Sequence, residues 1–146
     1  MTIGTGIGGG AVIDGHLLTG FGHPEMGHMI LQRHPDDVSF NSHCPFHDNC
    51  AEGLVSGPAI IARWGASLSE LGSHHPAQEI AAFYIGQICV NIIAILAPHD
   101  IILGGGVMQT EGLLEGVRRA SSMRANSYFF SDPSAIIKPP TLGVDS

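Results

Sequence analysis

The first 18 residues, Met1-Thr-Ile-Gly-Thr-Gly-Ile-Gly-Gly-Gly-Ala-Val-Ile-Asp-Gly-His-Leu-Leu18, join a glycine run to a β-hairpin pattern. Asp14-Gly15 separates two apolar segments, and Asp-Gly suits the positive φ angles of a type I′ turn. The glycines spell G-x-G-x-x-G, but a dinucleotide fingerprint requires a helix after them, and here a hairpin follows. We predict β structure over residues 2–20. The loop is either a plain β-bulge or a cradle whose backbone N–H groups hold an anion.

Beyond the hairpin, the chain alternates helical and strand patterns, which is α/β order. Apolar spacing predicts helices over residues 58–71, 76–96 and 110–125, and short apolar runs predict strands over residues 100–103 and 134–138. Residues 80–96 are apolar nearly all round but lack basic flanks and contain polar side chains. We therefore expect a buried core helix there, not a membrane span, with Cys89 as a buried thiol.

Composition indicates one globular domain, because 146 residues suffice for a real core and 44% of them are hydrophobic. Six Lys and Arg against 13 Asp and Glu give a net charge of −7, which disfavours nucleic-acid binding through phosphates. No secretory signal pattern opens the chain. Three cysteines, an odd number, fit a reducing compartment, so we expect a cytoplasmic protein with neither nucleic-acid nor membrane partners.

A long irregular segment, about residues 21–52, carries the pattern C-x2-H-x2-C at Cys44, His47 and Cys50. With His28 these side chains form a two-thiolate, two-imidazole set, which suits tetrahedral zinc, and metal binding would order a loop that has few apolar residues. A fully ligated site of this kind is structural. Other histidines compete for the fourth position, namely His23, His34 and His43. Free cysteines and a Cys44–Cys50 disulfide are the alternatives.

A second glycine run, Gly104, Gly105 and Gly106, follows the predicted strand over residues 100–103 and precedes a predicted helix. Ligands of open α/β sheets bind beyond the carboxyl ends of the strands, and a backbone without Cβ atoms allows close approach. This position suits a nucleotide. The alternative is a plain strand-to-helix turn.

Together these motifs resemble the C-terminal lobe of the ROK family (repressors, open reading frames and sugar kinases). The matching segments are Gly4–Gly10, Gly22–His28, Cys44–Gly53 and Leu103–Val107. The resemblance implies the two-lobed α/β fold of actin, hexokinase and the Hsp70 ATPase domain, which is ribonuclease H-like, with a zinc-bound loop. The loop Cys44-Pro-Phe-His-Asp-Asn-Cys50 is similar to that of the bacterial fructokinase subgroup.

The resemblance also implies roles for individual residues. ATP phosphates would lie on Gly4, Thr5, Gly6 and Gly8, and adenosine on Gly104, Gly105 and Gly106. Sugar hydroxyls would bind Glu25, His28 and Glu52, and structural zinc would be held by His28, Cys44, His47 and Cys50. The implied reaction is transfer of the γ-phosphoryl group of Mg-ATP to a hexose, most specifically fructose to fructose 6-phosphate.

Two parts of such a kinase find no match in the sequence. The family's catalytic aspartate stands in an Asn-Asp pair of the N-terminal lobe, beside a first phosphate loop, and no Asn-Asp dipeptide occurs here. Asp36-Asp37 is a poor substitute in its His-Pro-Asp-Asp context. We therefore expect residues 1–146 to form a C-terminal lobe alone, without an N-terminal lobe or catalytic base, and to associate as a homodimer. The alternatives are a non-catalytic sugar-binding regulator and a degenerate zinc-stapled fragment.

Overall fold

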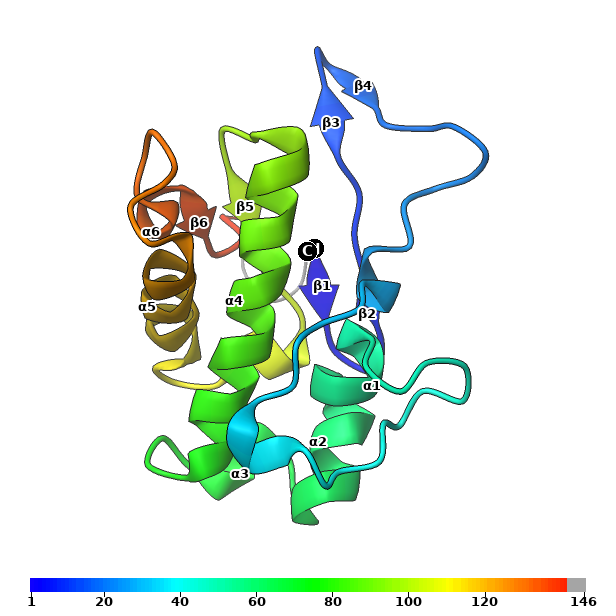
Figure 1. Ribbon diagram of the computed structural model, residues 1–146, viewed down its shortest axis with the longest axis vertical. Helices are drawn as coiled ribbons and strands as arrows, with labels where there is room; N and C mark the ends of the chain where they lie inside the picture. Colours follow the sequence, from blue (N-terminus) through cyan, green and yellow to red (C-terminus); the bar gives the residue numbers. More distant parts are fainter. Residues whose placement is uncertain (142–146) are drawn as a thin grey trace.

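The computed structural model describes residues 1–141, and a single long helix, α4 (Pro76–Leu96), runs through its centre (Figure 1). On one side α4 packs against α5 (Leu113–Ala125), and glycines permit the close approach of the two helices. Gly86 lies against Ala120, and Gly116 lies against Ala82. On the other side lie the N-terminal strands and α1 (Ala51–Val55).

Four short strands lie side by side next to α4. Strand β1 (Thr2–Ile3) pairs antiparallel with β2 (Ile7–Gly8), and β5 (Ile101–Ile102) pairs parallel with β6 (Ile137–Lys138). The two pairs meet where the Ile3 amide donates to the Gly104 carbonyl at 2.8 Å. This pairing brings the two glycine runs close together.

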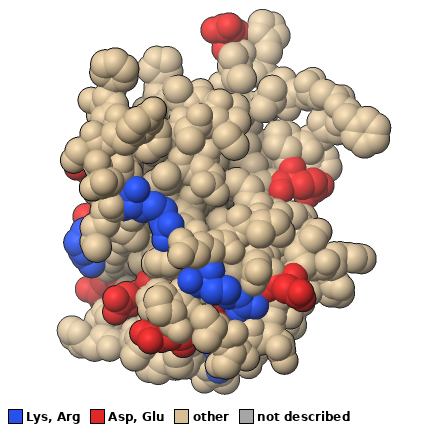
Figure 2. All heavy atoms as spheres, in the orientation of Figure 1, with Lys and Arg blue, Asp and Glu red and all other residues tan. Residues whose placement is uncertain are grey.

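The predicted hairpin is confirmed. Strands β3 (Val12–Ile13) and β4 (His16–Leu17) pair antiparallel, and Asp14 and Gly15 have φ angles of 51° and 78°. The hairpin projects from the body of the molecule (Figure 1), and Figure 2 shows it free of charged groups except for one acidic residue at its tip. Its apolar side chains are exposed, so the Asp-Gly turn determines its conformation without help from the core.

Two predicted elements were wrong in detail, and each error has a local cause. The single helix over residues 58–71 is two helices, α2 (Gly57–Trp64) and α3 (Leu68–Leu71). Gly65, with φ 78°, ends α2, and a capping box between Ser67 and Glu70 starts α3. The strand over residues 134–138 is reduced to β6, since Asp132 caps a helical turn, α6 (Pro133–Ile136). Three 3₁₀ turns complete the described elements, η1 (Met26–His28), η2 (Pro35–Asp37) and η3 (Gly106–Gln109).

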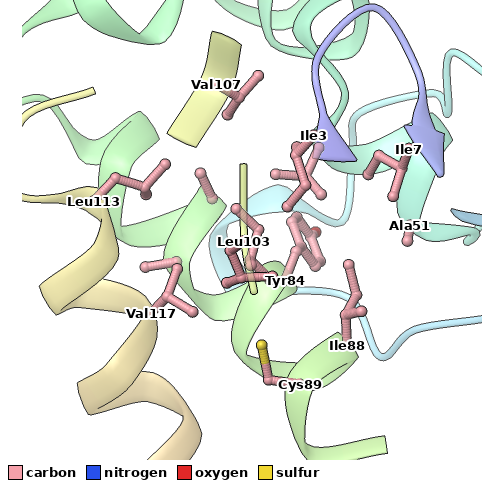
Figure 3. Packing of buried hydrophobic residues seen from close by; sticks show 14 of the residues in the cluster. Ile3, Ile7, Ala51, Tyr84, Ile88, Cys89, Leu103, Val107, Leu113 and Val117 are labelled. Atoms are coloured by element: carbon pink, nitrogen blue, oxygen red, sulfur yellow. The ribbon is translucent and has the colours of Figure 1, made fainter. Parts of the chain in front are cut away.

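Helix α4 has the predicted bounds and supplies the centre of the core. By length and hydropathy it is a candidate membrane span, yet 61% of its apolar window is buried within the fold, which supports the core-helix interpretation. Figure 3 shows Tyr84, Ile88 and Cys89 of α4 directed towards the strand residues and α5. Cys89 is fully buried as expected, and burial raises the pKa of its thiol to about 12.

A buried polar network that the sequence did not reveal ties the irregular segment to α2 and α4. Asp37 Oδ1 lies 2.8 Å from Arg63 Nε, and the Tyr84 hydroxyl donates to Asp37 Oδ2 at 2.6 Å. The Asp37 and Arg63 side chains are only 3% and 7% exposed. Burial lowers the pKa of Arg63 and the Asp37 charge opposes that shift, so this carboxylate compensates a buried cation.

Tyr84 should make the stability of the protein pH-dependent in the alkaline range. Burial, with the hydrogen bond to Asp37, raises its pKa to about 12 from 10.0. Between these values the unfolded chain loses the phenolic proton and the folded chain keeps it, so stability falls as pH rises from about 10 through about 12. We expect Tyr84→Phe to cost about 1.5–3 kcal/mol at pH 7, through the lost hydrogen bond to a charged acceptor.

Urea unfolding of wild type and Tyr84→Phe at pH 8, 10, 11 and 12 measures this effect. The stability gap between the two proteins should shrink above pH 10, because only wild type carries the Tyr84 phenol. Other alkaline groups, including Cys89, titrate in both proteins and cancel in the difference. A constant gap across the whole range would contradict the assignment.

Candidate functional site

Four side chains predicted as metal ligands come together beside the start of α1. The ligand atoms of His28, Cys44, His47 and Cys50 all lie within 4.8 Å of one another. Cys44 Sγ lies 3.7 Å from His47 Nδ1, and the rings of His28 and His47 are 5.2 Å apart between centroids. Two sulfurs and two imidazole nitrogens that converge on one point form a donor set typical of zinc.

His28 carries a buried ring nitrogen, Nδ1, that has no hydrogen-bond partner among residues 1–141. A buried polar atom without a partner is costly, and a metal ion would satisfy it. The three competing histidines lie outside the cluster. His23 pairs with Glu25, and His34 accepts from the Asp36 amide and packs edge-on against Phe83.

The cluster is built into the start of α1. Cys50 is the N-cap residue of this helix, and its Sγ accepts a hydrogen bond from the Gly53 amide at 3.4 Å. A Cβ at Gly53 would lie 2.0 Å from Ser42 Oγ and 2.8 Å from Cys44 Cβ, so the cysteine loop packs directly on the helix. Burial, with Cys44 nearby, raises the pKa of the Cys50 thiol. A bound cation would oppose that rise and favour the thiolate.

Beside α1, the first glycine run forms one wall of a cavity. The cavity is about 440 Å³ and is lined by Thr2, Gly4, Thr5, Gly6, Ile7, Gly8, Glu52 and Gly105. Glu52 reaches this loop, where its Oε2 accepts from the Ile7 amide at 2.9 Å. A Cβ at Gly6 would lie 2.9 Å from the same oxygen, so a side chain there would displace the carboxylate. The loop that is predicted to bind phosphates is therefore in direct contact with Glu52, one of the residues predicted to bind the sugar.

His28 lies on η1, which packs on β2, and Glu25 is the N-cap residue of η1. A Cβ at Gly27 would lie 2.0 Å from the Ile7 carbonyl oxygen, so only glycine allows this contact. Glu25 is largely exposed and pairs with His23 Nε2 at 2.7 Å. The structure thus brings η1, with its glutamate and histidine, beside the glycine loop, while Glu25 itself faces outward.

The second glycine run lies against the first. A Cβ at Gly4 would lie 3.8 Å from the Gly106 amide nitrogen. A second cavity of about 850 Å³ is lined by Met1, Thr2, Gly8, Gly9, Gly10, Ile102, Leu103, Gly104, Gly105, Gly106, Met108, Gln109, Pro139 and Pro140. Gly105 has φ 96°, and a Cβ there would lie 2.4 Å from the Ile3 carbonyl oxygen, so the fold alone explains this glycine. Gly106 has open space around it, and the fold gives no reason for its missing side chain.

Paired alanine substitutions separate these two glycines. Gly105→Ala should destabilise the protein by about 1–3 kcal/mol, because its backbone conformation is one that only glycine adopts easily and its Cβ meets β1. Gly106→Ala should change stability by less than about 0.5 kcal/mol, as expected for an open surface position. Thermal melting measures both. Equal losses would show that the fold also requires Gly106.

The sequence matches the profile of the ROK family over residues 1–146. The chain belongs to the ROK family. It is 49% identical over 146 residues to a fructokinase from Zymomonas mobilis, covering 98% of this chain and 48% of that protein. The chain therefore spans about half the length of the curated relatives it matches.

Solved ROK structures share the fold. A ROK hexokinase from Thermus thermophilus matches with a TM-score of 0.77 at 25% identity, over 99% of this chain and 51% of that one. A ROK family glucokinase from Streptomyces griseus, in complex with glucose and AMPPNP, matches with a TM-score of 0.68 at 23% identity, over 99% of this chain and 55% of that one. These neighbours confirm the actin/hexokinase-like kinase fold that the motifs implied.

Sequence reasoning missed the contacts between distant segments. The Glu52–Ile7 hydrogen bond joins residues 45 positions apart, and the Asp37–Tyr84 hydrogen bond joins residues 47 positions apart. The sequence around Asp36-Asp37 indicates only a poor catalytic candidate and gives no sign of the buried role of Asp37.

Proposed function

We propose that the chain is the C-terminal lobe of a ROK sugar kinase that transfers the γ-phosphoryl group of ATP to fructose. The observation that supports this proposal is the contact between Glu52 and the first glycine run, since both border one cavity. The 49% identity to a fructokinase supports fructose as the sugar. The AMPPNP complex of a structural neighbour supports ATP as the donor.

This proposal assigns the phosphates, the nucleoside and the sugar to different groups of residues. Phosphates would lie on the loop of Gly4, Thr5, Gly6 and Gly8, and Gly104, Gly105 and Gly106 would allow close approach of the nucleoside. The Gly4 amide itself donates to the Gly6 carbonyl at 2.9 Å. The carboxylates of Glu25 and Glu52 would accept hydrogen bonds from sugar hydroxyls. Mg²⁺ would arrive with ATP and neutralise its charge.

Zinc fits the cluster of His28, Cys44, His47 and Cys50 as a structural ion. The fit rests on the four converging ligand atoms and on His28 Nδ1, a buried atom that has no hydrogen-bond partner within residues 1–141. Zinc there would hold the cysteine loop against α1 and fix the orientation of the His28 ring. It would supply folding energy and no open position for chemistry.

The test is release of ADP in a coupled assay with fructose, glucose and mannose, using the product of the whole gene that encodes this chain. We expect turnover with fructose to exceed turnover with the other sugars by at least about tenfold, which is about 1.4 kcal/mol of discrimination. Absence of any sugar-dependent ADP release would overturn the kinase assignment. A protein that binds fructose without turnover would be a sugar-binding regulator instead.

A further inference from the structure

The Ile7 amide, in the loop proposed to receive phosphates, is already occupied by an anion that belongs to the protein. Glu52 Oε2 accepts from this amide at 2.9 Å, and both groups border the 440 Å³ cavity. A carboxylate at this position repels any phosphate that enters the same cavity, because two anions a few ångströms apart interact strongly where water is partly excluded. The Glu52 carboxylate therefore competes with phosphate for the glycine loop.

Glu52 is placed there by elements on both sides of it. It stands in the first turn of α1, two residues after Cys50, whose sulfur caps that helix. On the other side of the loop, the Gly57 amide at the start of α2 donates to the Gly4 carbonyl at 2.7 Å. The loop is thus fastened to the α1–α2 segment at two points, and only the Glu52 point carries charge.

We propose that Glu52 couples sugar binding to phosphate binding: sugar hydroxyls that donate to its carboxylate lower the repulsion at the glycine loop and raise the affinity for the nucleotide phosphates. This inference rests on the proposed function. The coupling is reciprocal, since two ligands that share one carboxylate change each other's affinity by the same factor. Glu52 would thus serve both as a sugar-binding residue and as the group that sets the charge at the glycine loop.

Glu52→Gln isolates the charge. The glutamine carbonyl still accepts from the Ile7 amide, so the loop keeps its shape while the repulsion disappears. We expect tripolyphosphate with Mg²⁺ to bind this variant at least about fivefold more tightly than wild type in the absence of sugar, the lower end of typical coupling factors. Fructose should tighten tripolyphosphate binding to wild type by a similar factor and should leave the variant unchanged.

Isothermal titration of the 146-residue chain measures these affinities. The matched control is Asp14→Asn, which removes one negative charge at the exposed hairpin tip and suits the turn, and it should leave tripolyphosphate affinity at the wild-type value. Amide hydrogen exchange adds a structural readout. The Ile7 amide should stay protected in Glu52→Gln and should exchange faster in Glu52→Ala.

The outcomes separate the two proposals. Equal or weaker tripolyphosphate binding by Glu52→Gln, with fructose effects the same in both proteins, overturns the coupling and leaves the kinase assignment standing. Absence of tripolyphosphate binding by every variant overturns the coupling, and the ADP-release assay on the whole gene product then decides the kinase assignment separately. Tighter binding by Glu52→Gln and Asp14→Asn alike would reduce the effect to net charge and would also overturn the coupling.

Discussion

Replacement of Cys44 or Cys50 by serine should abolish zinc binding, with bound metal falling from about one ion per chain to a small fraction of that. A hydroxyl is a poor zinc ligand at neutral pH, and the four ligand atoms lie within 4.8 Å of one another, so losing one opens the site. We expect a stability loss of several kcal/mol, because binding energy of a structural zinc is folding energy. Elemental analysis and thermal melting measure the two effects.

The matched control is the third cysteine. Cys89→Ala removes a buried thiol on α4, outside the cluster, so it should keep full zinc content. Hydrogen exchange should show lost protection around residues 41–50 in the serine variants. Residues 32–40 should stay protected, since Asp37 remains bound to Arg63 and Tyr84. Wild-type protein purified without zinc, or serine variants that retain it, would contradict the ligand set.

Asp37→Ala should be the most damaging single substitution outside the metal cluster, with a loss of about 3–5 kcal/mol. It leaves the buried Arg63 guanidinium without its carboxylate partner, and it removes the acceptor of the Tyr84 hydroxyl. The guanidinium also lies 3.8 Å over the Phe40 ring, which holds it in place and prevents its escape to solvent. Urea unfolding at pH 7 measures the loss.

The neighbouring residue supplies the control. Asp36 is 85% exposed, so Asp36→Ala should change stability by less than about 0.5 kcal/mol. The double variant Asp37→Ala with Arg63→Met should recover much of the loss, because it removes the uncompensated charge and keeps an apolar side chain of similar length. A small loss in Asp37→Ala alone would show that water reaches Arg63.

Elements whose cause is local were predictable from the sequence. The Asp14-Gly15 turn has the positive φ angles that its residue types favour, and α4 has the bounds that its apolar pattern predicted. The prediction of one helix over residues 58–71 was wrong for a local reason, since Gly65 adopts positive φ and Ser67 begins a new capping box. Backbone conformation and hydrophobic periodicity depend on residues that are close together in the sequence. The sequence alone can therefore predict turns and helices of this kind.

The candidate site was predictable in its residue types and less so in its contacts. The spacing of Cys44, His47 and Cys50 indicated a metal loop, yet three other histidines competed with His28 for the fourth position. The tertiary structure places His28 in the cluster because η1 packs on β2 through Gly27. The spacing of motifs along a chain does not say which of several similar side chains the folded backbone brings to one point.

The sequence by itself determined the α/β order, the hairpin, the central helix, the metal-type residues and the family. Only the tertiary structure decided that Glu52 lies on the glycine loop and that Asp37 is buried with Arg63 and Tyr84. Turns, caps and apolar periods depend on residues a few positions apart, whereas these polar contacts join segments that meet only when α1, α2 and α4 pack together. Their energy depends on burial, which the folded chain alone provides.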